Sequence, residues 1–176
     1  MRLLLAAFLT LCSSTLGWGQ RVHLFPDDQL VFRDMIAHVE NNVVRMGATW
    51  SGEVAFTLQD DGMWDEVHLH RGFSSSALDI AYTVREGQLV LGDTHFSDGI
   101  LYTFSEGQIF MGDSTFPMDV VYTLREERPA FPSRSGAPTF GVYKEDSRAW
   151  TDRLAVVEGV ATPAQLYALL SAAGLL

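Results

Sequence analysis

The stretch that decides the fold is a near-duplicate, since residues 81–94 read AYTVREGQLVLGDT and residues 101–114 read LYTFSEGQIFMGDS. A third copy opens at residues 121–126 with VYTLRE, so the pattern returns every 20 residues. A fixed period of this kind indicates a repeat architecture, because a single unit cannot bury its own apolar face and must stack on its neighbours. The central part of the chain is therefore predicted to be a tandem repeat.

Each unit has the pattern of a β-hairpin. Side chains alternate with period two, so that Tyr82 and Val84 share one face of a strand and Thr83 lies on the other. The pairs Glu86-Gly87 and Glu106-Gly107 then precede a second apolar run. Glycine supplies the positive φ of a tight hairpin turn. The Gly-Asp-Thr or Gly-Asp-Ser that follows is predicted to be the link to the next hairpin.

The same pattern extends outward to about six units. The outermost copies begin at Asp27-Asp28 and at Glu145, and both are divergent. The predicted fold class is all-β, built from tandem hairpin repeats that form either an open solenoid or a closed, barrel-like meander. Residues 32–39 are predicted to be a strand by the repeat register, although Phe32, Met35, Ile36 and Val39 also have helical spacing.

Two insertions interrupt the 20-residue period. Residues 59–66 lengthen one hairpin tip, and residues 127–141 contain a loop rich in proline, glycine and serine. Insertions in repeat proteins tend to collect on one face, which is often the binding face.

The C-terminal residues 162–176 are predicted to form a short helix. Thr162-Pro163-Ala164-Gln165 is a capping box with proline at the first helical position. The next residues form one apolar stripe of Leu166, Leu169, Leu170 and Ala173. We expect this capping helix to cover the exposed end of the hairpin stack, because an uncovered sheet edge pairs with further strands.

Residues 1–19 have the pattern of a secretory signal peptide. One positive charge precedes a short apolar run, and Gly17 and Gly19 occupy positions −3 and −1 of a cut before Gln20. The sequence thus predicts an exported protein, periplasmic, secreted or at the cell surface, with a repeat domain at residues 20–161. Cys12, the one cysteine, lies within the signal. Lipidation there is the alternative, but the bulky Leu11 disfavours it.

The charge and hydropathy of the chain limit its partners. The formal net charge is −10, with no cluster of lysine or arginine, so the protein should repel phosphate backbones and is not expected to bind nucleic acid. No second apolar segment reaches spanning length, so no transmembrane segment is predicted.

The unit at residues 72–83, with its copies at Gly92-Asp93-Thr94 and Gly112-Asp113-Ser114, resembles the repeat of small exported bacterial proteins built from tandem Gly-Asp-Ser and Asp-Ile-Leu-Tyr-Thr units. Those proteins often end in a short helix. The resemblance covers most of Gly47 to Val156, but the proline-rich insertion and Glu145, in place of the anchor glycine, depart from it. That family has no established activity, so the resemblance implies export and a fold and identifies no catalytic residue.

Aromatic residues in the links and tips are the candidate ligand-binding residues. A row of such rings is a common way for hairpin-repeat modules to bind polysaccharide, one ring against each sugar face. The candidates are Trp50, Trp64, Phe73, Phe96 and Phe116. The regularly spaced Tyr82, Tyr102 and Tyr122 are instead predicted to form a ladder in the core.

Two histidines are candidate metal ligands. His68 and His70 lie on the same face of a strand, with Asp65 and His95 as neighbours, and imidazole nitrogens bind zinc or copper. The alternative is that both lie on the solvent-facing side of the strand while Val67 and Leu69 point inward.

The acidic link residues allow a second metal hypothesis. Carboxylates that recur in the loops of an exported protein are ligands of the kind that calcium prefers, although turn capping explains them as well. They are Asp93, Asp98, Asp113 and Asp119.

An enzyme is not predicted. Ser74-Ser75-Ser76 is not a nucleophile elbow, and no phosphate-binding glycine loop occurs. A deeply buried histidine–carboxylate pair in the structure would argue otherwise. The predicted function is an exported, non-catalytic binding or structural module of the cell envelope, without a cofactor, that binds carbohydrate, another envelope component or a protein. The alternative is an extracytoplasmic scaffold stabilised by calcium or zinc, or a protein-interaction module.

Overall fold

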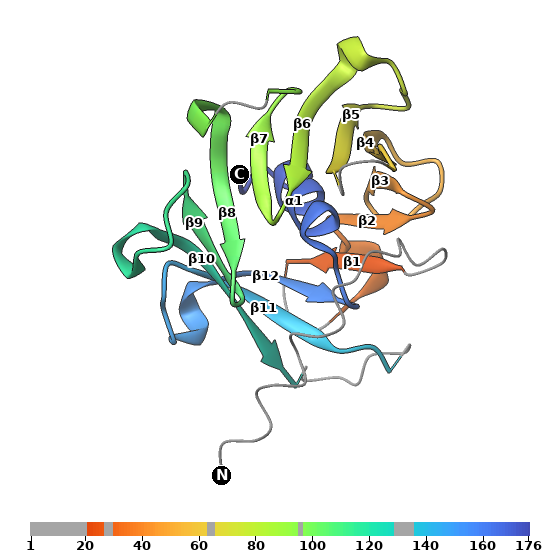
Figure 1. Ribbon diagram of the computed structural model, residues 1–176. Helices are drawn as coiled ribbons and strands as arrows, with labels where there is room; N and C mark the ends of the chain where they lie inside the picture. The colour runs from red at the N-terminus through yellow and green to blue at the C-terminus, as the bar shows by residue number, and fades with distance from the viewer. Residues whose placement is uncertain (1–20, 27–29, 63–65, 95–96, 129–135) are drawn as a thin grey trace.

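The computed structural model describes residues 21–26, 30–62, 66–94, 97–128 and 136–176. Twelve antiparallel strands form a closed barrel in which each strand pairs with its neighbours in the sequence and β1 pairs with β12 (Figure 1). Of the two forms expected for the repeat, the closed one is therefore correct. The strands are β1 (Val22–Phe25), β2 (Ala37–Glu40), β3 (Val43–Met46), β4 (Val54–Asp60), β5 (Glu66–Arg71), β6 (Ile80–Arg85), β7 (Gln88–Leu91), β8 (Ile100–Ser105), β9 (Gln108–Met111), β10 (Val120–Glu127), β11 (Thr139–Lys144) and β12 (Arg153–Glu158).

The barrel consists of six hairpins. Five are continuous in sequence, from β2–β3 to β10–β11, and the sixth joins the two ends of the chain, with Leu24 of β1 opposite Val157 of β12. The predicted turns are present, since Glu86 and Gly87 have φ values of 49° and 79° and Glu106 and Gly107 have nearly the same values, 50° and 80°. Positive φ at both central positions is the type I′ turn that matches the twist of the strands.

Neighbouring hairpins meet in one repeated register. At each of the six junctions, a residue of the second strand of one hairpin lies opposite a residue of the first strand of the next hairpin. These junction pairs are Val43–Thr57, His68–Thr83, Gln88–Thr103, Gln108–Thr123, Gly141–Val156 and His23–His38. The four threonine hydroxyls each donate a hydrogen bond to a carbonyl where a link begins, that of Gly72, Gly92, Gly112 or Glu145.

The links between hairpins all lie at one end of the barrel, because consecutive antiparallel strands alternate in direction and the hairpin turns lie at the other end. Five links contain one turn of 3₁₀ helix, η1 (Phe32–Asp34), η2 (Ala77–Asp79), η3 (Ser97–Gly99), η4 (Pro117–Asp119) and η5 (Trp150–Asp152), and Figure 1 shows several of these turns outside the ring of strands. In three links a serine hydroxyl donates to the aspartate that ends the 3₁₀ turn, as Ser74 does to Asp79 over 2.6 Å. Turn capping is therefore the role of Asp119.

The links also cover the outer face of the sheet. His70 is only 2% exposed, and its Nδ1 donates to the carbonyl of Ser76 in the link above it. Phe25, Val90, Phe110 and Tyr143 occupy the equivalent position in other hairpins and are buried as well. The outer face thus has an apolar layer of its own, which the alternation of polar and apolar residues does not predict.

Residues 32–39 begin as the single turn η1 and continue as β2 from Ala37. The strand expected from the repeat register is confirmed for the second half of this segment, and the extended amphipathic helix is absent. Residues 27–29, where the first unit was expected to begin, lie outside the described part of the chain, as do residues 1–20 with the predicted signal and Cys12.

The helix α1 (Pro163–Ala172) lies inside the ring of strands (Figure 1). Its predicted capping box is present, since Gln165 N donates to the Thr162 hydroxyl and Thr162 N donates to the Gln165 side chain. All residues from Ala164 to Leu170 are buried, and Tyr167 donates a 2.9 Å hydrogen bond to the carbonyl of Gly87 in a hairpin turn. A helix buried on every side needs no polar face.

The expectation that α1 covers an open sheet edge is wrong, because a closed barrel has no open edge. The helix packs instead against the inward side chains, one of which each hairpin contributes, namely Leu24, Val44, Leu69, Leu89, Ile109 and Val142. Tyr82, Tyr102 and Tyr122 pack against the same cluster, as predicted for a core ladder. In the described part of the chain, no helix has the length and hydrophobicity needed to cross a membrane.

Candidate functional site

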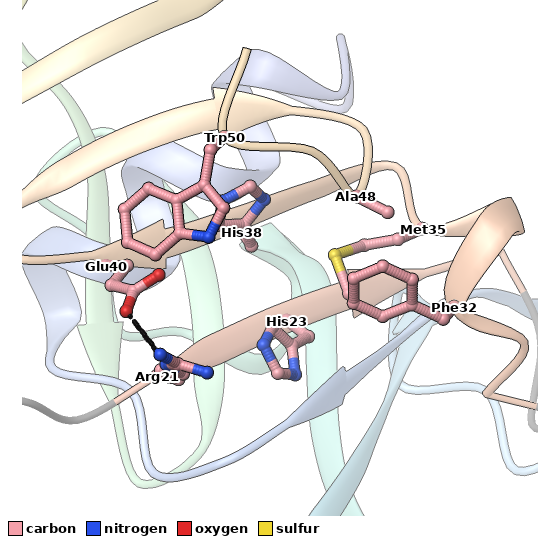
Figure 2. Close-up of a pocket in the computed structure, with 8 residues that line it drawn as sticks. All are labelled: Arg21, His23, Phe32, Met35, His38, Glu40, Ala48 and Trp50. Carbon is pink, nitrogen blue, oxygen red and sulfur yellow. Dashed lines mark hydrogen bonds and ion pairs between the residues drawn. The ribbon is translucent and has the colours of Figure 1, made fainter. Parts of the chain in front are cut away.

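A small pocket lies on the outside of the barrel, over β1 and β2 and beside the link that follows β3 (Figure 2). Its volume is about 50 Å³, enough for an ion or one or two waters. The side chains around it include aromatic rings, charged groups and a thioether. They are Arg21, His23, Phe32, Met35, His38, Glu40, Ala48 and Trp50.

Both histidines of the pocket are held by a hydrogen bond at Nδ1. His23 Nδ1 lies 3.0 Å from a carboxylate oxygen of Glu158, and His38 Nδ1 lies 2.7 Å from the carbonyl oxygen of Gly47. A carbonyl or an ionised carboxylate only accepts, so each Nδ1 carries the proton and donates. In a neutral ring that donates from Nδ1, the lone pair is at Nε2, and neither Nε2 has a hydrogen-bond partner among the described residues.

The rim of the pocket is charged on one side and aromatic on the other. Arg21 and Glu40 form an ion pair of 2.7 Å, which holds the arginine against the carboxylate. Trp50 and Phe32 are 60% and 59% exposed, so a large part of each ring faces solvent beside these charges. An exposed aromatic ring next to charged hydrogen-bonding groups is the usual composition of a site for a polar ligand with one apolar face.

The predicted ligand-binding aromatics fall into two groups. Trp50 lines the pocket, while Phe73 and Phe116 are 80% and 69% exposed in the links after β5 and β9. Trp64 and Phe96 lie outside the described residues.

Sequence analysis did not select Leu78, Met118 or Trp150 as candidate binding residues. All three lie in links, and all are more than 70% exposed. Phe32 is exposed in a link too, so five links of the described chain display a large apolar side chain at one end of the barrel.

The predicted metal ligands His68 and His70 lie close together, with ring centroids 6.2 Å apart, but their surroundings differ. His68 Nδ1 is 3.1 Å from the hydroxyl of Thr83 in the same junction pair. His70 is buried under a link, so the expectation that it faces solvent is wrong, whereas the inward orientation of Val67 and Leu69 is confirmed. His70 Nε2 is buried and lacks a hydrogen-bond partner in the described chain.

The grouping that the structure offers around His68 is different from the predicted pair. One ligand atom each of Asp61, Glu66 and His68 lie within 4.8 Å of one another at the tip of the β4–β5 hairpin. Glu66 also faces Arg85 at 3.6 Å, which competes with a cation for that carboxylate. Asp65 and His95, the other neighbours considered, lie outside the described residues. Among the link aspartates, Asp113 accepts a 2.7 Å hydrogen bond from Gln88 of another hairpin.

His23 and Glu158 form the kind of histidine–carboxylate pair that would argue for an enzyme. The carboxylate is buried, while the imidazole side chain is 21% exposed. The described residues that line the pocket include no hydroxyl or thiol that could serve as a nucleophile.

Sequence analysis missed His23 and His38, although a signal for them existed. Residues His68 and Thr83, Gln88 and Thr103, and Gln108 and Thr123 are each 15 positions apart, and so are His23 and His38. His38 therefore stands where four other units carry threonine.

The sequence model of a family described as 6-fold beta flower protein matches residues 27–131. That range contains β2 to β10, which form most of the six hairpins seen in the structure. No curated protein and no solved structure matches the chain significantly.

Proposed function

This chain belongs to the 6-fold beta flower family, and from that premise we propose that it is an exported, non-catalytic binding module that recognises carbohydrate or another component of the cell envelope. The predicted signal at residues 1–19 is the basis for export. The observation that carries the binding role is the display of exposed aromatic rings from links at one end of the barrel, with Trp50 beside the charges of Arg21 and Glu40.

Several features support this reading. A sugar ring has an apolar face that stacks on an aromatic side chain and hydroxyls that bond to charged groups at its edge. Exposed apolar groups collected on one region of a soluble protein commonly mark a binding surface. The net charge of −10 argues against nucleic acid as the partner.

The role of Trp50 is tested by co-sedimentation of residues 20–176 with peptidoglycan and a panel of insoluble polysaccharides. We expect specific retention on at least one of them, and Trp50→Ala should weaken it by at least about 30-fold, the effect of losing about 2 kcal/mol of contact energy. The melting temperature should change little, because the ring is more than half exposed.

The matched control is Val160→Ala, which removes an exposed apolar side chain between β12 and α1, outside the links. It should leave retention unchanged. If no glycan retains the protein, or if both variants bind as the unmodified chain does, the proposal is wrong and a protein partner takes its place.

A second candidate function rests on the cluster at the β4–β5 tip. We propose, as the alternative, a scaffold stabilised by calcium or zinc through Asp61, Glu66 and His68, whose ligand atoms lie within 4.8 Å of one another. Chelator should then lower the melting temperature of the metal-loaded protein. His68→Gln introduces the residue that Gln88 provides at the equivalent junction, and the melting temperature of this variant should not depend on metal. An unchanged melt in the presence of chelator contradicts this alternative.

A further inference from the structure

We propose that the pocket over β1 and β2 is a binding site for one monovalent copper ion, held by the Nε2 atoms of His23 and His38 and by the thioether sulfur of Met35. This inference goes beyond the proposed function and does not depend on it. It begins from the one junction at which the sixfold repeat places two imidazoles opposite each other.

The equivalent junctions show what His23 and His38 do differently. At two of them the paired side chains bond to each other, His68 with Thr83 over 3.1 Å and Gln108 with Thr123 over 3.4 Å. In the junction pair His23–His38 the rings do not bond to each other, and their centroids are 6.5 Å apart with planes inclined at 64°.

Each ring bonds instead through Nδ1 to a group outside the pair. A histidine that binds a metal commonly donates its other N–H to a carboxylate or a backbone carbonyl, because that bond fixes the tautomer and the ring orientation. Glu158 fills this role for His23, and the Gly47 carbonyl fills it for His38. The two Nε2 lone pairs are thus set in the form that a metal needs.

Met35 makes the site soft. Its side chain is buried and lines the same pocket, and Figure 2 shows its sulfur directed toward the space that the two imidazole rings also border. A thioether is a poor ligand for zinc or calcium and a good one for Cu(I), which also accepts imidazole. Copper(I) tolerates low coordination numbers, so three such ligands are enough.

The charges beside the pocket and the ring of Trp50 fit a bound cation. The guanidinium of Arg21 is paired with Glu40, and the Glu158 carboxylate lies behind His23. Trp50 also lines the pocket, and an aromatic face attracts a cation (Figure 2).

The repeat itself supplies the variants for the test. His38→Thr introduces the residue of four other units, whose hydroxyl makes the same bond to the carbonyl at the start of a link. His23→Gln introduces the residue of the Gln88 and Gln108 positions. Met35→Ile introduces the residue of two other units, because Ile80 and Ile100 each lie three positions before their junction threonine, as Met35 lies before His38. All three should therefore fold, and circular dichroism with thermal melting checks this.

The measurement is anaerobic competition for Cu(I) between the purified protein and bicinchoninate, with X-ray absorption of the loaded protein to identify the ligand atoms. We expect one ion per chain, with one sulfur and two imidazole nitrogens. His38→Thr, His23→Gln and Met35→Ile should each weaken binding by more than about 100-fold, beyond the effect of losing an outer hydrogen bond alone, and Met35→Ile should remove the sulfur signal.

Met111→Ile is the matched control, because it removes an exposed thioether of β9 that does not line the pocket, and it should leave Cu(I) affinity unchanged. The proposal is overturned if the unmodified protein retains no Cu(I), if His38→Thr binds it equally well, or if the bound ion has no sulfur neighbour. No polysaccharide enters this experiment, so its failure leaves the glycan-binding proposal standing, and loss of glycan binding leaves the copper site standing.

Discussion

Replacing Tyr167 by alanine should lower the free energy of unfolding by about 3–5 kcal/mol, because it opens a cavity the size of an aromatic ring within the barrel. Tyr167 is the largest of the fully buried side chains and lies in the run of residues that the strands enclose. The total free energy of unfolding of a domain of this size is commonly about 5–15 kcal/mol, so the loss is large. Urea unfolding monitored by circular dichroism measures it.

Tyr167→Phe is the control that separates the ring from its hydroxyl. It should cost only about 1 kcal/mol, because the Gly87 carbonyl that loses the tyrosine hydroxyl still accepts the backbone N–H of Phe104. Equal losses for the alanine and phenylalanine variants would show that α1 does not fill the interior.

The second large effect is a loss of stability at alkaline pH. Burial raises the pKa of Tyr167 and of Tyr122 above the usual value. For Tyr143, burial is again the main cause, and its hydrogen bond to Glu127 raises the pKa further. Below pH 10 these tyrosines are neutral in both the folded and the unfolded chain. Above it the unfolded chain releases phenolic protons that the barrel retains, so the unfolded state binds fewer protons and stability falls as pH rises.

Tyr167 alone should contribute about 1.4 kcal/mol of lost stability for each pH unit between its ordinary pKa and its raised one. Urea midpoints measured from about pH 8 to 11 should therefore decline steeply at the upper end, with phenolate absorbance rising as the protein unfolds. Tyr167→Phe should decline less steeply over the same range. A variant whose pH dependence matches that of the unmodified protein would remove Tyr167 from this account.

Local patterns in the sequence were enough to predict the hairpins and the helix. The 20-residue spacing of Tyr82, Tyr102 and Tyr122 predicts both the strands and the core ladder, and Glu86-Gly87 predicts the turn, because each depends on residues close together in the chain. The capping box at Thr162 likewise predicts where α1 begins.

The features that sequence analysis missed depend on contacts between distant segments. The pairing of β1 with β12 decides that the repeat closes, and closure in turn places α1 inside rather than over an edge. The burial of His70 arises because the link after β5 folds back over the strand, which period-two alternation cannot indicate.

The candidate site was only partly predictable for the same reason. An exposed link aromatic such as Trp50 can be recognised from its position between two strands. The convergence of His23, His38 and Met35 could not be read from the local pattern. His23 lies on β1, which pairs both with β2 and with β12 from the other end of the chain.

The seam between β1 and β12 also constrains the order in which the barrel can assemble. His23 and Glu158 are 135 residues apart in sequence, so the seam is a contact of very long range. As the chain is synthesised from its N-terminus, the five continuous hairpins can form one after another, but β1 has to wait without its second partner until β12 is available. Because α1 follows β12, the interior cannot be filled before the last residues arrive. We therefore expect ring closure and enclosure of the helix to come last in folding, and a sheet that has not yet closed exposes an unpaired strand edge at each end.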